Sequence, residues 1–180
     1  NRKGPLRILV FGGSQGAKVF NQLLPFIFKK INNKNKLSIT HQSGENMFEL
    51  LKESYKDVSF KVEIRKYFFD MEKKYNWADI VIARSGALTV SELIQSGTAS
   101  ILIPYPSAVD DHQFFNAKIL EDVGAAKIVR EKELEKKLIV NLAKLNRKKC
   151  EDMALKAKQL HHYDACNEVL KVCNSLINEK

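Results

Sequence analysis

The residues best suited to chemistry form the stretch Ala-Arg-Ser-Gly-Ala-Leu-Thr-Val-Ser-Glu, from Ala83 to Glu92. An apolar strand-like run precedes it and a helix-like run follows, so it is predicted to be a strand–turn–helix junction. The free N–H groups and the dipole at the start of a helix favour a phosphate, and Gly86 lets a ligand approach the backbone. Glu92, one turn further, could accept two hydrogen bonds from a ribose diol. The stretch predicts a nucleotide-diphosphate cradle; the alternative is an ordinary junction in which Thr89 and Glu92 form a capping box.

Two polar segments follow earlier predicted strands. Gly12–Gly16 lacks both the G-x-G-x-x-G spacing of dinucleotide folds and the lysine of a P-loop, but it could face a phosphate or a sugar with Ser14. The alternative is a tight turn that packs a helix against the sheet. His41–Gly44 could supply a base only with a partner that the sequence does not identify, which favours a polar loop.

Two more segments complete the set. Tyr67–Phe69 could provide a flat apolar wall and a backbone amide for a nucleobase, although three consecutive aromatic residues are more typical of a core. Asp110 and Asp111 could bind a metal, but no second carboxylate cluster accompanies them, and either could cap the helix that follows. Gln113 could form hydrogen bonds with sugar hydroxyls.

The elements that must position these residues alternate regularly along the chain. Short apolar runs predict strands at residues 6–11, 37–41, 58–64, 79–83, 100–103 and 126–129, with a helix after each of the first five and a helical pattern from residue 131 onward. This pattern predicts an α/β fold: a Rossmann-like, doubly wound, parallel six-stranded sheet with helices on both faces and a helical carboxyl-terminal tail. Ligands of such sheets bind beyond the carboxyl ends of the strands, where all the segments above lie.

Composition limits the function further. A length of 180 residues suits one domain, and the formal charge of +9 favours an anionic partner such as a phosphate or an anionic membrane surface. No aromatic residues interleave a basic stripe, which argues against nucleic acid. The cysteines Cys150, Cys166 and Cys173 form no CxxC pair and indicate a reducing compartment, and His161–His162 has no metal-ligand spacing.

Taken together, the motifs resemble those of a known family. Their order and spacing are similar to the carboxyl-terminal half of the MurG family of bacterial UDP-N-acetylglucosamine (UDP-GlcNAc) transferases, in glycosyltransferase family 28. The segments that carry the resemblance are Gly12–Ala17, His41–Gly44, Trp77–Asp79, Arg84–Glu92, Asp111–Ala117 and Gly124–Ala126. The resemblance implies one half of a GT-B fold, whose carboxyl-terminal domain binds the donor UDP-GlcNAc.

The resemblance also implies roles for individual residues. Ser14 would contact the donor diphosphate or sugar, and the Phe68 backbone beside Tyr67 would read uracil. Glu92 would hold the ribose hydroxyls, and Gln113, with His112, would hold the sugar hydroxyls. The phosphates would lie against Gly86, Ala87, Leu88 and Thr89, and Arg84, Val90 and Ser91 complete the implied donor-binding set. No cofactor, metal or catalytic residue is expected in this chain, because the family's probable base lies in its amino-terminal domain.

The organisation implied for the whole family extends beyond this chain. Residues 1–5 are expected to be a linker remnant, 6–163 the donor-binding domain, and 164–180 a helix that packs back toward a missing acceptor domain. That domain would bind the undecaprenyl-linked acceptor, lipid I, at the cytoplasmic face of the bacterial inner membrane, in an inverting, metal-independent transfer. The isolated chain is then expected to be inactive. Two alternatives remain: a separate donor-binding subunit of a two-component transferase, and a UDP-GlcNAc 2-epimerase-like enzyme.

Overall fold

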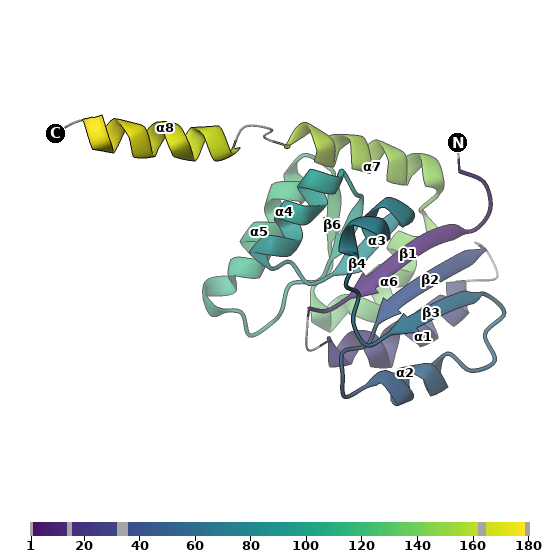
Figure 1. Cartoon of the computed structure of the whole chain (residues 1–180). Coiled ribbons are helices and arrows are strands. Elements are labelled where there is room, and N and C mark those ends of the chain that lie inside the picture. Colours follow the sequence, from purple (N-terminus) through teal and green to yellow (C-terminus); the bar gives the residue numbers. More distant parts are fainter. Residues whose placement is uncertain (1, 14–15, 32–35, 162–164, 179–180) are drawn as a thin grey trace.

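A computed structural model of the chain describes residues 2–13, 16–31, 36–161 and 165–178 (Figure 1). Strands and helices alternate from the start of the described chain, as the apolar periodicity predicts. The elements are β1 (Leu6–Phe11), α1 (Lys18–Ile31), β2 (Leu37–Gln42), α2 (Phe48–Ser54), β3 (Lys61–Arg65), α3 (Met71–Trp77), β4 (Ile80–Ala83), α4 (Ala87–Ser96), β5 (Ser100–Leu102), η1 (Val109–Asp111), α5 (His112–Asp122), β6 (Ala126–Ile128), η2 (Glu131–Glu133), α6 (Leu134–Ala143), α7 (Arg147–Gln159) and α8 (Ala165–Asn178).

The six strands form one parallel sheet in the order β3-β2-β1-β4-β5-β6. The chain moves outward from β1 to β3, then returns to place β4 on the other side of β1. This reversal creates a topological switch point between β1 and β4, where such sheets hold ligands. Phe11 pairs with Ala83 in register, so the loops that leave these two strands start side by side.

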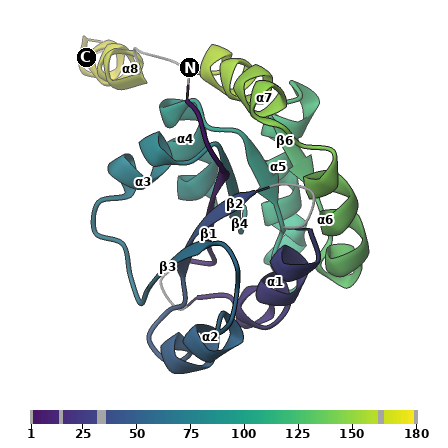
Figure 2. The same cartoon turned by 90° about the vertical axis from the view of Figure 1, so that its right-hand side faces the viewer.

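Two apolar cores cover the two faces of the sheet. One packs α1, α2 and α6 against the sheet, with Phe20, Phe28 and Leu138 fully or almost fully buried. The other packs α3, α4 and α5, with Leu93 and Leu120 fully buried. Helices therefore lie on both faces, which confirms the doubly wound prediction (Figure 2).

Three predicted element starts are wrong by two or more residues, and two predicted environments are wrong. β3 starts at Lys61 rather than residue 58, α2 at Phe48 rather than 45, and α3 at Met71 rather than 69. His41, predicted as the last residue of a strand that leads into a polar loop, is fully buried, and the strand continues one residue further to Gln42. Phe69 is 96% exposed rather than part of the core.

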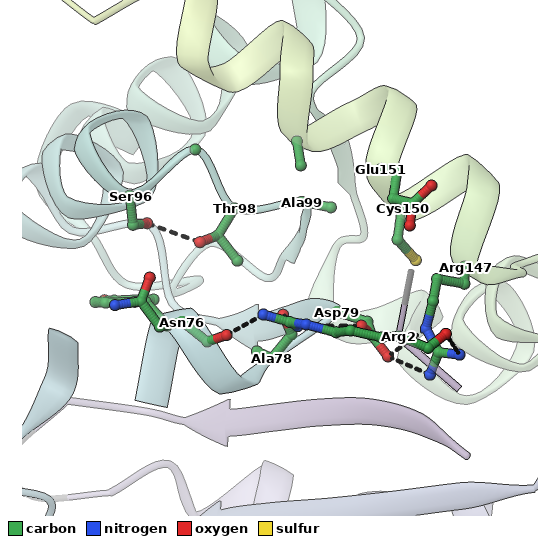
Figure 3. Close-up of a pocket in the computed structure, with 13 residues that line it drawn as sticks. Arg2, Asn76, Ala78, Asp79, Ser96, Thr98, Ala99, Arg147, Cys150 and Glu151 are labelled. Atoms are coloured by element: carbon green, nitrogen blue, oxygen red, sulfur yellow. Dashed lines mark hydrogen bonds and ion pairs between the residues drawn. The ribbon is translucent and has the colours of Figure 1, made fainter. Parts of the chain in front are cut away.

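An ion cluster around the buried carboxylate of Asp79 lies at the amino end of the sheet. Asp79, whose side chain is 4% exposed, accepts hydrogen bonds from the guanidinium groups of Arg2 and Arg147 and from the backbone N–H of Arg7. Arg147 also donates to the carbonyl oxygens of residues 2, 4 and 5. The segment expected to be a linker remnant is therefore held against the domain, beside a hollow of about 320 Å³ (Figure 3).

Helix α8 extends away from the sheet beyond the end of α7 (Figure 1). Its described apolar side chains Leu170, Val172, Leu176 and Ile177 are all more than half exposed. None of the described helices is long and apolar enough to cross a membrane.

Candidate functional site

A cleft of about 570 Å³ opens at the carboxyl ends of β1 and β4, at the switch point of the sheet. It brings together segments that are more than a hundred residues apart in sequence. The residues that line it are Gly12, Gly13, Gly16, Ala17, Lys18, Val19, Arg84, Gly86, Thr89, Tyr105, Gln113 and Glu131. Four of the residues implied for donor binding, Arg84, Gly86, Thr89 and Gln113, thus share one cleft.

The glycine turn after β1 forms one wall of the cleft. At Gly12 and Gly16, neighbouring atoms leave no space for a side chain. A Cβ on Gly12 would lie 2.3 Å from the Cβ of Ala17, and a Cβ on Gly16 would lie 2.2 Å from the carbonyl oxygen of Ser43. Gly13 and Gly16 also have positive φ values of 90° and 73°, which L side chains rarely adopt. The turn therefore lies close to both α1 and the end of β2.

The amino terminus of α4 forms the opposite wall. Gly86 is its N-cap residue, and the first helical hydrogen bond runs from the Val90 N–H to the Gly86 carbonyl. The N–H groups of Ala87, Leu88 and Thr89 precede that bond, so they have no acceptor within the helix. No acidic residue lies in the first turn, and nothing lies within 4 Å of a Cβ built on Gly86. These features leave room for an anion at a helix terminus that attracts one.

The capping box, which is the alternative interpretation of this stretch, is absent. Because α4 starts at Ala87, Thr89 is already its third residue and cannot be the N-cap, and no side chain caps this terminus. The carboxylate of Glu92 instead accepts a hydrogen bond of 2.7 Å from the hydroxyl of Tyr75. Glu92 lines a separate hollow of about 450 Å³ between α3 and α4.

Arg84 is held within the cleft wall rather than directed into open space. Its guanidinium lies 4.8 Å from the ring centroid of Phe20 and 5.3 Å from that of Tyr105. It donates to the carbonyls of Ile103 and Pro104 and forms an ion pair of 2.5 Å with Glu131. Most of its donors are thus used inside the chain, and it shapes the cleft.

Gln113 is fixed by hydrogen bonds on both its side chain and its backbone. Its Oε1 accepts from the backbone N–H of Tyr105, and its carbonyl accepts from the hydroxyl of buried Ser85. The side-chain amide of Asn116 donates to the carbonyl of Ser85. These bonds join the start of α5 to the loop after β4, so they hold Gln113 at a fixed position relative to Gly86.

The acidic pair before α5 does not cap the helix through a side chain. Asp110 and Asp111 both adopt left-handed backbone conformations, with φ of 49° and 52°. Asp111 forms two hydrogen bonds of 2.6 and 2.7 Å with Arg130, which lowers the pKa of its carboxyl. The carboxylate of Asp111 is thus paired with Arg130, and no group of three or more potential metal ligands occurs among the described residues.

The other implied residues that the structure describes are not among the residues that line the cleft. Val90 is 4% exposed and packs in the core, so its side chain is turned away from any ligand. His112 is exposed, with its Nδ1 2.8 Å from the carbonyl oxygen of Val109. The half-buried Tyr67 and Phe68 lie in the loop between β3 and α3. Ala87, Leu88 and Ser91 are exposed on α4, and Ser14 lies outside the described residues.

Sequence reasoning missed Lys18, Tyr105 and Glu131, which line the cleft. Lys18 follows the glycine turn by two residues and begins α1, so its position next to a predicted phosphate site was a usable signal. Tyr105 and Glu131 come from distant loops, and only folding shows that both contact Arg84.

Comparison with known proteins adds independent information. Residues 7–169 match the glycosyltransferase family 28 C-terminal domain. The chain belongs to this family.

Named relatives support the same family membership. The chain is 44% identical over 179 residues to the UDP-N-acetylglucosamine–N-acetylmuramyl-(pentapeptide) pyrophosphoryl-undecaprenol N-acetylglucosamine transferase of Wigglesworthia glossinidia brevipalpis, covering 98% of this chain and 49% of that protein. It is 42% identical over 175 residues to the transferase of the same name from Psychromonas ingrahamii, covering 96% and 49%. The crystal structure of Acinetobacter baumannii MurG superposes with a TM-score of 0.89 at 38% identity, covering 97% of this chain and 51% of that one.

The chain therefore spans about half the length of the relatives it matches. The resemblance seen in the motifs is confirmed, and so is the fold: the six-stranded sheet of the family 28 domain is one half of a GT-B fold.

Proposed function

We propose that this chain is the donor-binding half of a glycosyltransferase that moves N-acetylglucosamine from UDP-GlcNAc to lipid I, giving lipid II for peptidoglycan. The observation that carries this proposal is the open amino terminus of α4 in the cleft of a family 28 domain. The named relatives are transferases about twice as long as this chain. Their names favour this function over a 2-epimerase or a separate donor-binding subunit.

In this proposal the diphosphate lies at the start of α4. Its oxygens accept hydrogen bonds from the first N–H groups of the helix, beside Gly86 and the hydroxyl of Thr89. When the acceptor hydroxyl attacks the anomeric carbon, the bond to the UDP oxygen breaks and negative charge grows on the diphosphate. Fixed N–H dipoles stabilise that charge without rearranging, which lowers the barrier. Lys18, exposed on the opposite wall, adds positive charge.

The two ends of the donor would extend to either side of the diphosphate. The sugar hydroxyls lie toward Gln113 and the glycine turn, where Ser14 is the proposed contact. The ribose hydroxyls lie toward Glu92, with uracil toward Tyr67 and Phe68, and the exposed residues Ala87, Leu88 and Ser91 flank the nucleotide. His112 and Arg84 act by holding their loops. Inversion of the anomeric centre needs a general base, which we place in an amino-terminal domain that also binds lipid I.

The exposed apolar residues of α8 suit contact with that acceptor domain, because an apolar helix face gains free energy when it leaves water. We divide the chain accordingly into residues 1–5 that lead in from the acceptor domain, a donor-binding domain over 6–163, and a returning helix over 164–180. The net charge of +9 suits association with the anionic inner face of the bacterial inner membrane, where lipid I is found.

Titration calorimetry of the chain with UDP-GlcNAc tests the proposal. We expect saturable binding that EDTA does not change. Gly86→Ala is the decisive variant: the added methyl meets no atom of the protein within 4 Å, so folding loses only the roughly 0.5–1 kcal/mol typical of an N-cap change. The methyl would occupy the space of the diphosphate and lower the affinity by at least tenfold.

Two outcomes would contradict the proposal. One is the absence of UDP-GlcNAc binding to the unmodified chain, and the other is Gly86→Ala binding with unchanged affinity. The chain alone should also fail to turn over lipid I, since the proposed base is not part of it; full turnover would refute the two-domain division.

A further inference from the structure

The segment Gln42–Gly44, at the end of β2, lies between two parts of the proposed donor site. The side-chain Nε2 of Gln42 donates a hydrogen bond of 3.0 Å to the carbonyl of Gly13 in the glycine turn. Its Oε1 accepts a hydrogen bond of 3.0 Å from the backbone N–H of Phe68, in the loop between β3 and α3. One buried side chain thus connects two loops that are 55 residues apart in sequence.

The chemistry of the two partners fixes the orientation of this amide. A backbone carbonyl only accepts hydrogen bonds and a backbone N–H only donates them, so the Gln42 nitrogen must face Gly13 and its oxygen must face Phe68. Gln42 is 7% exposed, so water has little access to replace either bond. A side chain of another length, or without both a donor and an acceptor, cannot make the same connection.

Neighbouring contacts support the same pair of loops. The N–H groups of Ser43 and Gly44 donate to the carbonyls of Arg65 and Lys66, at the start of the Phe68 loop. On the other side, the carbonyl of Ser43 lies so close to Gly16 that no side chain fits there. Asn21 of α1 holds the same carbonyl with a hydrogen bond of 2.8 Å. Residues 42–44 therefore contact both loops directly.

We propose that Gln42 is a positioning residue, whose side chain sets the distance between the glycine turn and the Phe68 loop for a uridine diphosphate sugar that touches both. This inference rests on the proposed function. A ligand that reaches from one loop to the other binds best when both are already at the correct separation, because it need not order them itself. The affinity of a smaller ligand that touches only the Phe68 loop and α4 depends less on the separation of the two loops.

The test compares two ligands and three variants of the chain. In Gln42→Met the side chain keeps its length but loses both hydrogen bonds. We expect its affinity for UDP-GlcNAc to fall at least tenfold, while its affinity for UMP, followed by NMR titration, falls less than threefold. Gln42→Glu keeps the acceptor for the Phe68 N–H but places a second oxygen against the Gly13 carbonyl, so its UDP-GlcNAc affinity should fall at least as far as that of Gln42→Met. Thr40→Val changes a buried residue on the same face of β2, two positions earlier, and should leave both affinities unchanged.

Amide hydrogen exchange gives a readout independent of the ligand. The Phe68 N–H should exchange faster in Gln42→Met and remain protected in Gln42→Glu. Should the methionine variant fail to fold, Gln42→Glu alone decides the test through its loss of UDP-GlcNAc affinity relative to UMP.

Three results would overturn the inference. An equal loss of affinity for both ligands would show a general structural role, and unchanged UDP-GlcNAc affinity in the folded variants would show no role in positioning. If the unmodified chain binds no UDP-GlcNAc, the proposed function fails and this inference fails with it; if the chain binds and the variants do not differ, only this inference fails.

Discussion

The two ends of the parallel sheet differ in what their polar groups contact. At the amino end, the hollow of about 320 Å³ is lined by Arg2, Asp79 and Arg147, which bond to one another and to the backbone of residues 2–5 (Figure 3). At the carboxyl end, the cleft of about 570 Å³ is lined in part by glycines and by the amino terminus of α4. Both ends are polar and each has a helix amino terminus, but the side chain of Asn146 caps α7 at the amino end, whereas no side chain caps α4 at the carboxyl end.

The charges show the same difference. Burial of Asp79 raises the pKa of its carboxyl, but hydrogen bonds from Arg147, the Arg7 N–H and Arg2 outweigh burial, and the net shift is downward. Asp79 is therefore a carboxylate whose charge the protein already neutralises. Burial beside it raises the pKa of the Cys150 thiol to about 12, which makes this thiol a poor nucleophile. The amino end thus has the properties of a structural cluster, and a hollow with charged residues is not by itself a site.

The largest expected effect tests that structural role. Asp79→Ala leaves two arginines without their shared carboxylate and the Arg7 N–H without its acceptor. We expect the free energy of unfolding to fall by about 3 kcal/mol. This value is at the lower end of the range measured when one partner of a buried ion pair is removed, because both arginines are partly exposed. Urea denaturation measures this loss. The affinity of the folded variant for UDP-GlcNAc should not change.

A matched control exists in the same hollow. Glu151 lines it but is exposed, so Glu151→Gln should change the free energy of unfolding by less than about 0.5 kcal/mol. If Asp79→Ala reduced donor affinity without reducing stability, the division between a structural end and a binding end would be wrong.

The next effect concerns a buried group close to the carboxyl end. His41 is fully buried, its Nδ1 lies 2.9 Å from the hydroxyl of Tyr55, and burial lowers the pKa of its imidazole from 6.5 to about 3. Below pH 6.5 the unfolded chain binds a proton that the folded chain excludes, so stability falls as the pH falls toward 3. At pH 5.0 this loss should reach about 2 kcal/mol relative to pH 7.5.

Urea denaturation at the two pH values checks this dependence. His41→Gln should remove most of it, whereas His112→Gln, which changes an exposed histidine, should leave it intact. A free energy of unfolding for the unmodified chain that does not change between pH 7.5 and 5.0 would show that His41 is protonated in the folded state.

The smallest expected effect is on binding alone. Glu92→Gln removes the charge proposed to hold the ribose hydroxyls, and we expect the UDP-GlcNAc affinity to fall about tenfold, equivalent to about 1.4 kcal/mol. Because Glu92 is exposed, the free energy of unfolding should change by less than about 0.5 kcal/mol. Titration calorimetry and urea denaturation measure the two quantities.

Glu72→Gln is the control, because Glu72 lines the same hollow between α3 and α4 and has no proposed contact with the ribose. Equal UDP-GlcNAc affinities of the Glu92 and Glu72 variants would show that Glu92 does not bind the ribose. The proposed site would then rest mainly on the amino terminus of α4.

The regular parts of the fold could be predicted because their signals are local. The apolar runs at β1, β4 and β5 are short and end in turn residues, and the alternation of strands and helices indicates a parallel sheet. β3 was placed too early because it is an edge strand with partly exposed residues, so Val58 extends the apolar run without belonging to the strand. The helical spacing of Val90 to Leu93 predicts a core position for Val90. The family motif around Val90 instead led to its inclusion in the donor-binding set.

The sequence by itself determined the strand–turn–helix junctions, and with them the start of α4 near Gly86, because glycines and helix periodicity act over a few residues. Only the tertiary structure decided which loops meet at the cleft. Strand order decides which distant groups pair there. Examples are the ion pair between Arg84 and Glu131 and the hydrogen bond between Gln113 and Tyr105. The hydrogen bonds of Gln42 with Gly13 and Phe68 depend on strand order in the same way. Hydrogen bonds between side chains and distant backbone groups leave no pattern along the chain, because each partner is selected by distance in space.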